Sequence, residues 1–176
     1  MSTQNHIIKS NNYEHIQRKV KTMYISDLHI HSRFSRATSK EGDPEHLELW
    51  ARKKGIHLVG TGDFTHPQWR EELKEKLEPE GTGLYKLKKE YRIQDGETPD
   101  SIEPRFVVTG EISSIYKKNG KTRKVHNLLI LPGLEEGDRL SARLEEIGNI
   151  HSDGRPILGL DCRALLELML ETVPNG

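Results

Sequence analysis

The sequence has one cysteine, Cys162, among its 176 residues, and no apolar run that is long enough to cross a membrane. A single cysteine excludes an internal disulfide, and its place in a leucine-rich stretch predicts a small core residue on a helix. The first residues also lack the apolar segment of a secretion signal. These absences predict a cytoplasmic protein with no membrane partner.

Net charge is absent as well, because 27 lysines and arginines balance 27 aspartates and glutamates. Overall charge therefore gives no support for strong nonspecific attraction to nucleic acid. The length suffices for one domain with a real core, whereas residues 1–22 carry no strong pattern. We therefore expect an extension over residues 1–22 and a folded domain over residues 23–176.

Two histidines separated by one residue close an apolar segment that begins at Tyr24. If that segment is a strand, His29 and His31 point to the same side of it. Two imidazoles with a nearby carboxylate that orients a ring, here Asp27, form half of a transition-metal site. The alternative is a surface strand with two solvated histidines, because a chain with 9 histidines contains chance pairs.

Three further apolar runs carry a residue that can bind a metal. Two of them end in a carboxylate, at Asp63 and Glu111, and the carboxyl ends of parallel strands gather functional groups at one rim. The third run opens with its residue, His126, so an antiparallel strand must bring it to the same rim. A hairpin that turns at Asn119-Gly120, with strands over residues 112–117 and 121–131, provides that strand.

Together these motifs resemble the PHP (polymerase and histidinol phosphatase) superfamily, whose members are distorted seven-stranded β/α barrels with metal ions in the mouth. The longer strings around them resemble the amino-terminal part of the endonuclease Q family, DNA repair nucleases that nick beside deaminated bases. The strings are DLHIHSRFSRATSK, LVGTGDFTHPQW, VTGEIS and KVHNLLILP. The similarity runs from Met23 to the last residue.

The resemblance implies metal-assisted phosphodiester hydrolysis of DNA that contains deaminated bases. The ligands that it implies are His29, His31, Asp63, Glu111 and His126, with Asp27 outside the ligand shell. Glu111 is the natural bridge between two divalent ions, because one carboxylate can ligate both. Mixed imidazole and carboxylate ligands suit zinc or manganese better than magnesium.

The chain departs from the family in three places. No aspartate follows the paired histidines, Phe64 stands where many members have a histidine, and the later histidine and Asp-x-His motifs do not follow His126. His66 is either a substitute for the missing histidine or a solvated capping residue, and His151 is expected in an exposed loop.

These departures predict an α/β fold that is a partial distorted PHP-type (β/α)7 barrel with a β-hairpin, truncated so that it lacks the C-terminal strands. They also leave other functions open. One is a catalytically inactive remnant that binds metal or a partner. Another is a phosphomonoesterase similar to histidinol phosphatase, which the endonuclease-like strings disfavour.

Basic residues gather in two places. Arg33, Arg36 and Lys40 stand where the family carries an aspartate, and they predict contact with DNA phosphates. The second group surrounds the hairpin turn and consists of Lys117, Lys118, Lys121, Arg123 and Lys124. It is either a solvated basic face or a phosphate contact.

Helices are predicted over residues 44–54, 67–77, 134–147 and 161–171. The first has the clearest signals, because Asp43 and Pro44 begin it and Gly55 ends it. Residues 78–104 are predicted to form an exposed insertion. Trp50 is expected in the core, whereas Trp69 is expected either in the core or facing a ligand.

Overall fold

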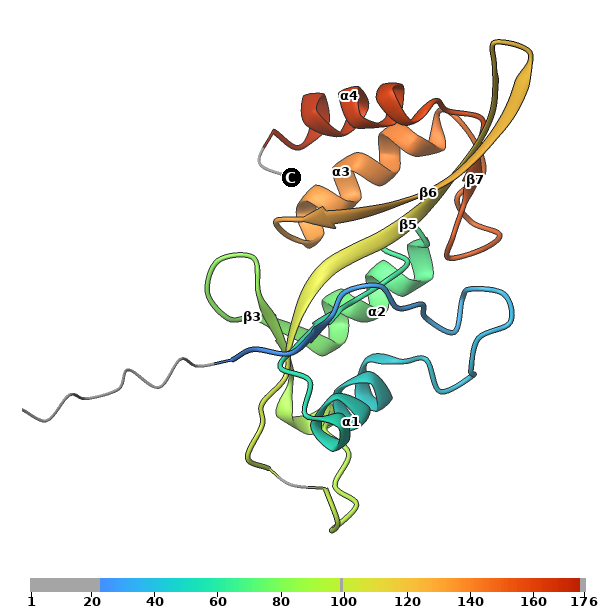
Figure 1. Ribbon diagram of the computed structural model, residues 1–176. Coiled ribbons are helices and arrows are strands. Elements are labelled where there is room, and N and C mark those ends of the chain that lie inside the picture. Colours follow the sequence, from blue (N-terminus) through green and yellow to red (C-terminus); the bar gives the residue numbers. More distant parts are fainter. Residues whose placement is uncertain (1–22, 99, 175–176) are drawn as a thin grey trace, which may run out of the picture.

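The computed structural model describes residues 23–98 and 100–174 (Figure 1). The expected extension over residues 1–22 lies outside the described residues. The strands are β1 (Ser26–Asp27), β2 (Leu58–Gly60), β3 (Leu77–Pro79), β4 (Tyr85–Leu87), β5 (Arg105–Lys118), β6 (Lys121–Leu131) and β7 (Ile157–Leu158). The helices are α1 (Pro44–Lys54), α2 (Pro67–Lys76), α3 (Leu134–Glu145) and α4 (Cys162–Thr172), with a 3₁₀ helix at Lys89–Tyr91.

Strand β5 is the centre of a mixed sheet of seven strands, in the order β1-β2-β5-β4-β3, with β6 and β7 also paired to β5. Its first residues lie parallel to β2, and from Val108 onward it is antiparallel to β6. The predicted strand ending at Glu111 and the first hairpin strand are one continuous strand, because no turn residue separates them. The long β5–β6 ribbon projects beyond α3 and α4 in Figure 1.

The helix predictions are confirmed to within two residues, and α1 agrees at both ends. The Asp43 side chain accepts a hydrogen bond from the backbone N–H of His46, and Pro44 fills the first turn. Gly55 ends the helix with φ 73°, a left-handed conformation that glycine adopts without strain.

Two tryptophans behave differently from each other. Trp50 is 50% exposed, so the prediction that it lies in the core is wrong; the ammonium groups of Lys53 and Lys54 lie over its ring. Trp69 is fully buried and its indole N–H donates to the carbonyl oxygens of Thr61 and Gly62. Trp69 therefore supports the strand end that leads to Asp63 and does not face a ligand.

The predicted insertion over residues 78–104 is partly regular, because β3 and β4 lie within or beside it and extend the sheet. The sequence signal for these strands is weak, since each has three residues.

Cys162 is the first residue of α4 and is half-buried, with its Sγ 3.8 Å from the hydroxyl of Tyr116.

One continuous core connects the sheet to the helices. It includes Phe64, Trp69, Leu73, Phe106, Val108, Ile112, Leu131, Leu140, Leu144, Ile150 and Leu165. The opposite face of β6 is less covered, and Leu128 and Ile130 are 39% and 43% exposed there.

Within residues 23–98 and 100–174, no helix combines the length and the apolar character needed to cross a bilayer.

Candidate metal centre

The two paired histidines lie in the irregular segment that follows β1, pressed against the end of β2. Their rings are 5.3 Å apart between centroids and nearly perpendicular. Gly60 and Gly62 allow this approach, because a Cβ atom there would lie 2.6 Å from the Leu28 carbonyl oxygen and 2.4 Å from that of Ile30. Two glycines at a strand end therefore bring the histidine segment next to the chain that carries Asp63.

Glu111, in the middle of β5, is the centre of the site. Its Oε2 lies 2.8 Å from Nε2 of His29 and 3.7 Å from Nε2 of His31, while its Oε1 lies 2.7 Å from Nδ1 of His126. Glu111 is buried, whereas the His29 and His126 side chains are 50% and 62% exposed. One buried carboxylate thus presents a separate oxygen to each of two imidazole groups.

The antiparallel hairpin brings His126 to this place. Ser113 pairs with His126 in the ladder, so His126 shares a face with Ser113 and with Glu111 two residues earlier. The predicted reversal of the chain at Asn119-Gly120 is confirmed, with both residues at positive φ.

Asp63 holds His31 in place. Its Oδ1 is 3.1 Å from Nδ1 of His31, and its Oδ2 accepts hydrogen bonds from the Ser32 backbone, the Ser32 hydroxyl and the Ser35 hydroxyl at 2.7 to 2.8 Å. The carboxylate is fully buried, and all these partners occupy both of its oxygens. Asp63 therefore lies one hydrogen bond away from the cluster of donor atoms.

Electrostatics keep Asp63 ionised. Burial by itself raises the pKa of the Asp63 carboxyl, but hydrogen bonds from His31, Ser32 and Ser35 outweigh burial and hold that pKa below its ordinary value. An ionised Asp63 accepts a hydrogen bond from Nδ1–H of His31, and Nε2 is the ring nitrogen of His31 that faces Glu111.

The residues fit a transition-metal ion. One donor atom from each of His29, His31 and Glu111 lies within 4.8 Å of the others, so these three residues could hold a metal. Two imidazole nitrogens and a carboxylate oxygen are a donor set typical of zinc, manganese and iron sites. His126 lies beside this group, on the other oxygen of Glu111.

Asp27 lies apart from the cluster. It is exposed on β1 and borders a pocket formed with α1, together with Trp50 and Lys54. Among the described residues, no hydrogen bond joins it to His29 or His31. The carboxylate within hydrogen-bond distance of His31 is that of Asp63, at 3.1 Å, because β1 ends at Asp27 and the regular alternation of side chains does not continue to His29.

The three predicted phosphate contacts have different surroundings. Arg33 pairs with Glu72 at 2.8 Å and with Asp43 at 3.6 Å, so its positive charge is balanced by carboxylates in the middle of α2 and at the start of α1. Arg36 is 80% exposed and lies beside Asp153, at 3.4 Å. Lys40 is exposed in a turn. Arg36 and Lys40 are thus better placed than Arg33 to meet a phosphate.

Three residues that support the site were not found from the sequence. Ser32 and Ser35 bind Asp63, and Gly154 packs against the same carboxylate, where a Cβ atom would lie 2.3 Å from Oδ2. Serines and glycines in loops are common, so no signal in one sequence separates these from others. His66 occupies the N-cap position of α2 but makes no side-chain capping hydrogen bond, and it is buried against Phe34, so the expectation of a solvated capping residue is wrong. Burial lowers the pKa of His66.

We predict that Asp63→Asn lowers the affinity for zinc or manganese by about 10- to 100-fold without abolishing binding, because an orienting partner is lost and the ligands remain. Metal titration monitored by calorimetry measures this. The control is Asp95→Asn, an exposed carboxylate in the loop before β5. Complete loss of metal in Asp63→Asn would identify Asp63 as a direct ligand instead.

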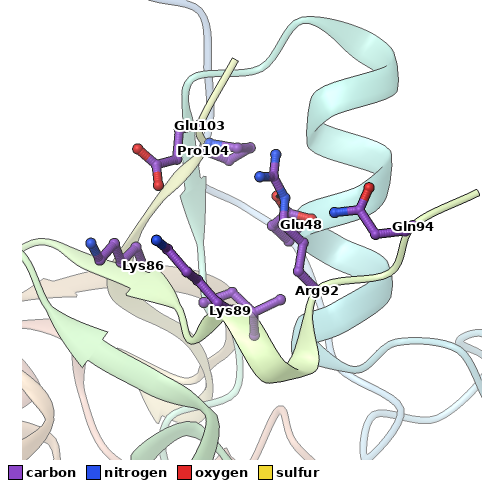
Figure 2. A pocket seen from close by; sticks show the side chains of 8 residues that line it. Glu48, Lys86, Lys89, Arg92, Gln94, Glu103 and Pro104 are labelled. Carbon is purple, nitrogen blue, oxygen red and sulfur yellow. Dashed lines mark hydrogen bonds and ion pairs between the residues drawn. The ribbon is translucent and has the colours of Figure 1, made fainter. Parts of the chain in front are cut away.

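A cavity of about 180 Å³ between α1 and the segment after β4 is distinct from this centre (Figure 2). Its wall is charged, but Arg92 pairs with Glu48 at 3.1 Å, and the buried Arg52 binds the same carboxylate. Both arginines also pair with Asp100, at 3.1 and 3.6 Å, so two carboxylates balance the two guanidinium groups and link α1 to residues 92–100. The cavity therefore has a structural explanation.

The chain is similar to proteins of known sequence and structure, although no protein-family model matches it. An uncharacterized protein of Methanocaldococcus jannaschii is 31% identical over 144 residues, which cover 81% of this chain and 14% of that protein. The crystal structure of the lesion-specific endonuclease Q of Pyrococcus furiosus matches with a TM-score of 0.66 and 32% identity, over 84% of this chain and 32% of the other.

A second structure, endonuclease Q bound to a 27-mer duplex with an abasic lesion at its active site, matches with a TM-score of 0.65 and 31% identity. That match covers 85% of this chain and 32% of the other. The chain therefore spans about a third of the endonuclease Q structures and shares their mixed α/β fold. The likeness supports a relationship to DNA endonucleases.

Proposed function

We propose that this chain is the amino-terminal, metal-binding part of an endonuclease Q-like enzyme that nicks DNA beside deaminated bases. The observation that carries the proposal is the position of Glu111 between His29 and His31 on one oxygen and His126 on the other. The identity to endonuclease Q, at 32%, supports it. The activity of the whole enzyme is part of the proposal, because this chain spans about a third of those structures.

We further propose that residues 23–176 form the first part of a PHP-type barrel. The parallel strands β1, β2 and the start of β5 are consistent with this, because the segments that follow β1 and β2 carry His29 and Asp63 to the place where the middle of β5 carries Glu111. Leu128 and Ile130 of β6 are exposed on one face of the sheet. Their exposure, together with the unpaired edge of the sheet, is consistent with further strands packing there in the whole enzyme.

In the proposed site, His29, His31, Glu111 and His126 hold divalent metal, with zinc or manganese suited best by the donor set. Bound metal would supply a water of lowered pKa and would stabilise the leaving oxygen of the phosphodiester. Asp63 keeps the proton on Nδ1 of His31, so that Nε2 stays available as a ligand. Arg36 and Lys40 are placed to bind phosphates of the DNA strand.

The test is a nicking assay with the full chain and duplexes that contain uracil, hypoxanthine or an abasic site, in the presence of zinc or manganese. Because the later ligand motifs of the family do not follow His126, we expect weak nicking next to the lesion, which depends on the metal and is lost in Glu111→Gln, a change that keeps the shape of the side chain and removes its charge. Absence of nicking by a chain that binds both metal and DNA would favour the inactive remnant.

A phosphomonoesterase similar to histidinol phosphatase is the second candidate, because the same donor set can act on a small phosphate ester. Hydrolysis of a monoester such as para-nitrophenyl phosphate, measured under the same conditions, separates the two. Faster turnover of the monoester than of lesion DNA would contradict the endonuclease proposal.

A further inference from the structure

An open groove leads away from the metal centre along β5. It encloses about 340 Å³, and Glu111 and His126 border it at the end next to the metal centre. Ser113, Ile115 and Ile157 of β5 and β7 line its middle. The groove therefore runs from the metal centre past alternate residues of β5, on the face that continues toward the hairpin turn.

Two arginines border the groove on the side opposite β6. The side chains of Arg36 and Arg155 share one carboxylate, Asp153, at 3.4 and 3.8 Å, and Arg155 also donates to the Arg36 carbonyl oxygen at 2.8 Å. Two guanidinium groups share this one carboxylate, so this border carries a net positive charge; the other carboxylate of the groove, Glu111, belongs to the metal centre. An anion in the groove would be attracted to this border.

The hairpin continues the groove with one basic face. Side chains alternate along each strand, so Lys124 shares the face of His126, and Lys117, opposite Thr122, shares it too. Neighbouring side chains on one face of a strand lie roughly 6 to 7 Å apart. Both residues are exposed, and among the described residues no carboxylate pairs with either of them.

The other face of the same hairpin has different contacts. Lys118 binds Asp161 at the start of α4 at 2.7 Å, and Tyr116 lies beside Cys162. Lys121 and Arg123, which pair with these residues in the ladder, lie on that second face. The hairpin therefore has two basic faces. Lys117 and Lys124 lie on the face that carries His126, and Lys118, Lys121 and Arg123 lie on the face turned toward α4.

We propose that the groove and the metal-side face of the hairpin form a track for the phosphodiester backbone of one DNA strand, with Lys124 and Lys117 binding phosphates that flank the nicked bond. This inference rests on the proposed function and adds to it the path of the substrate. Phosphates repeat at a short, regular interval along a strand, and a row of unpaired ammonium groups on a rigid β-ribbon matches such a repeat.

The test compares Lys117→Gln/Lys124→Gln with a matched control, Lys121→Gln/Arg123→Gln, in the full chain. Each variant removes two positive charges from the same hairpin, but from opposite faces. The binding of a fluorescein-labelled duplex with an abasic-site analogue is measured by anisotropy over a range of salt concentrations. We expect the slope of log affinity against log salt to fall by about 1.8 in the first variant, which is about 0.9 for each phosphate that is no longer neutralised, and by less than half as much in the control.

Equal reductions of the slope in the two variants, or no reduction in either, would overturn the track. Metal content and circular dichroism of both variants are expected to match the unaltered chain, because all four side chains are exposed. The proposed nuclease function is tested by a different result from the one that tests the track. A chain that shows the predicted difference between the faces but never nicks DNA supports the track and contradicts the nuclease, whereas nicking without the difference contradicts the track alone.

Discussion

Replacing Glu111 by alanine is expected to abolish stable metal binding, with a loss of affinity greater than about 100-fold, since even residues outside the ligand shell cost 10- to 100-fold. Glu111 contacts all three histidines of the centre and is the one carboxylate in the group that could hold a metal. Without this carboxylate, His29 and His31 lose the acceptor that they share, and no side chain connects His126 to them. Elemental analysis of the purified chain measures the effect.

The control for this variant is Glu171→Ala, an exposed glutamate near the end of α4. We expect it to keep the metal content of the unaltered chain. A Glu111→Ala protein that is folded by circular dichroism and retains its zinc or manganese would show that the metal is held elsewhere. His29→Ala provides a second, independent check, because its ring nitrogen lies 2.8 Å from Glu111.

Gly62→Ala is expected to have the largest effect on stability, about 2 to 5 kcal/mol, from left-handed backbone strain together with steric overlap. Gly62 has φ 64°, and a Cβ atom there would lie 2.4 Å from the carbonyl oxygen of Ile30. That oxygen belongs to the backbone between the paired histidines, which cannot move without moving both rings. Metal affinity should therefore fall together with the free energy of unfolding, measured by denaturant titration.

Gly96→Ala is the matched control. Gly96 has a similar φ, 73°, but a Cβ atom there would have nothing within 4 Å. It should cost only the backbone strain, about 1 to 2 kcal/mol, and should leave metal binding unchanged. If both variants lost the same stability and both kept their metal, the close approach at Gly62 would not position the histidines.

Much of the local structure could be predicted from the sequence because its signals act over a few residues. Asp43, Pro44 and Gly55 determine α1, and Asn119-Gly120 determines the hairpin, since capping and positive φ are properties of the local chain. Short strands were not predictable in the same way. β3 and β4 have three residues each, and their pairing partners lie outside the local sequence.

For the candidate site as well, some features could be predicted from the sequence and others depended on tertiary contacts. The sequence by itself determined which side chains could bind a metal, because imidazoles and carboxylates stand at the ends of apolar runs. Which of them share a donor cluster depended on hydrogen bonds between distant segments. Asp63 has both oxygens hydrogen-bonded, to His31, Ser32 and Ser35, while Asp27 borders a pocket beside α1.

The basic residues show why only the tertiary structure could decide between the alternatives. Arg33 and Arg36 are three positions apart in the sequence, yet Arg33 is paired with Glu72 and Arg36 is largely exposed beside the groove. The hairpin lysines look equivalent in the sequence, and the strand ladder divides them into two faces. Charge is a property of the residue, but whether that charge is free depends on the carboxylates that the fold brings next to it.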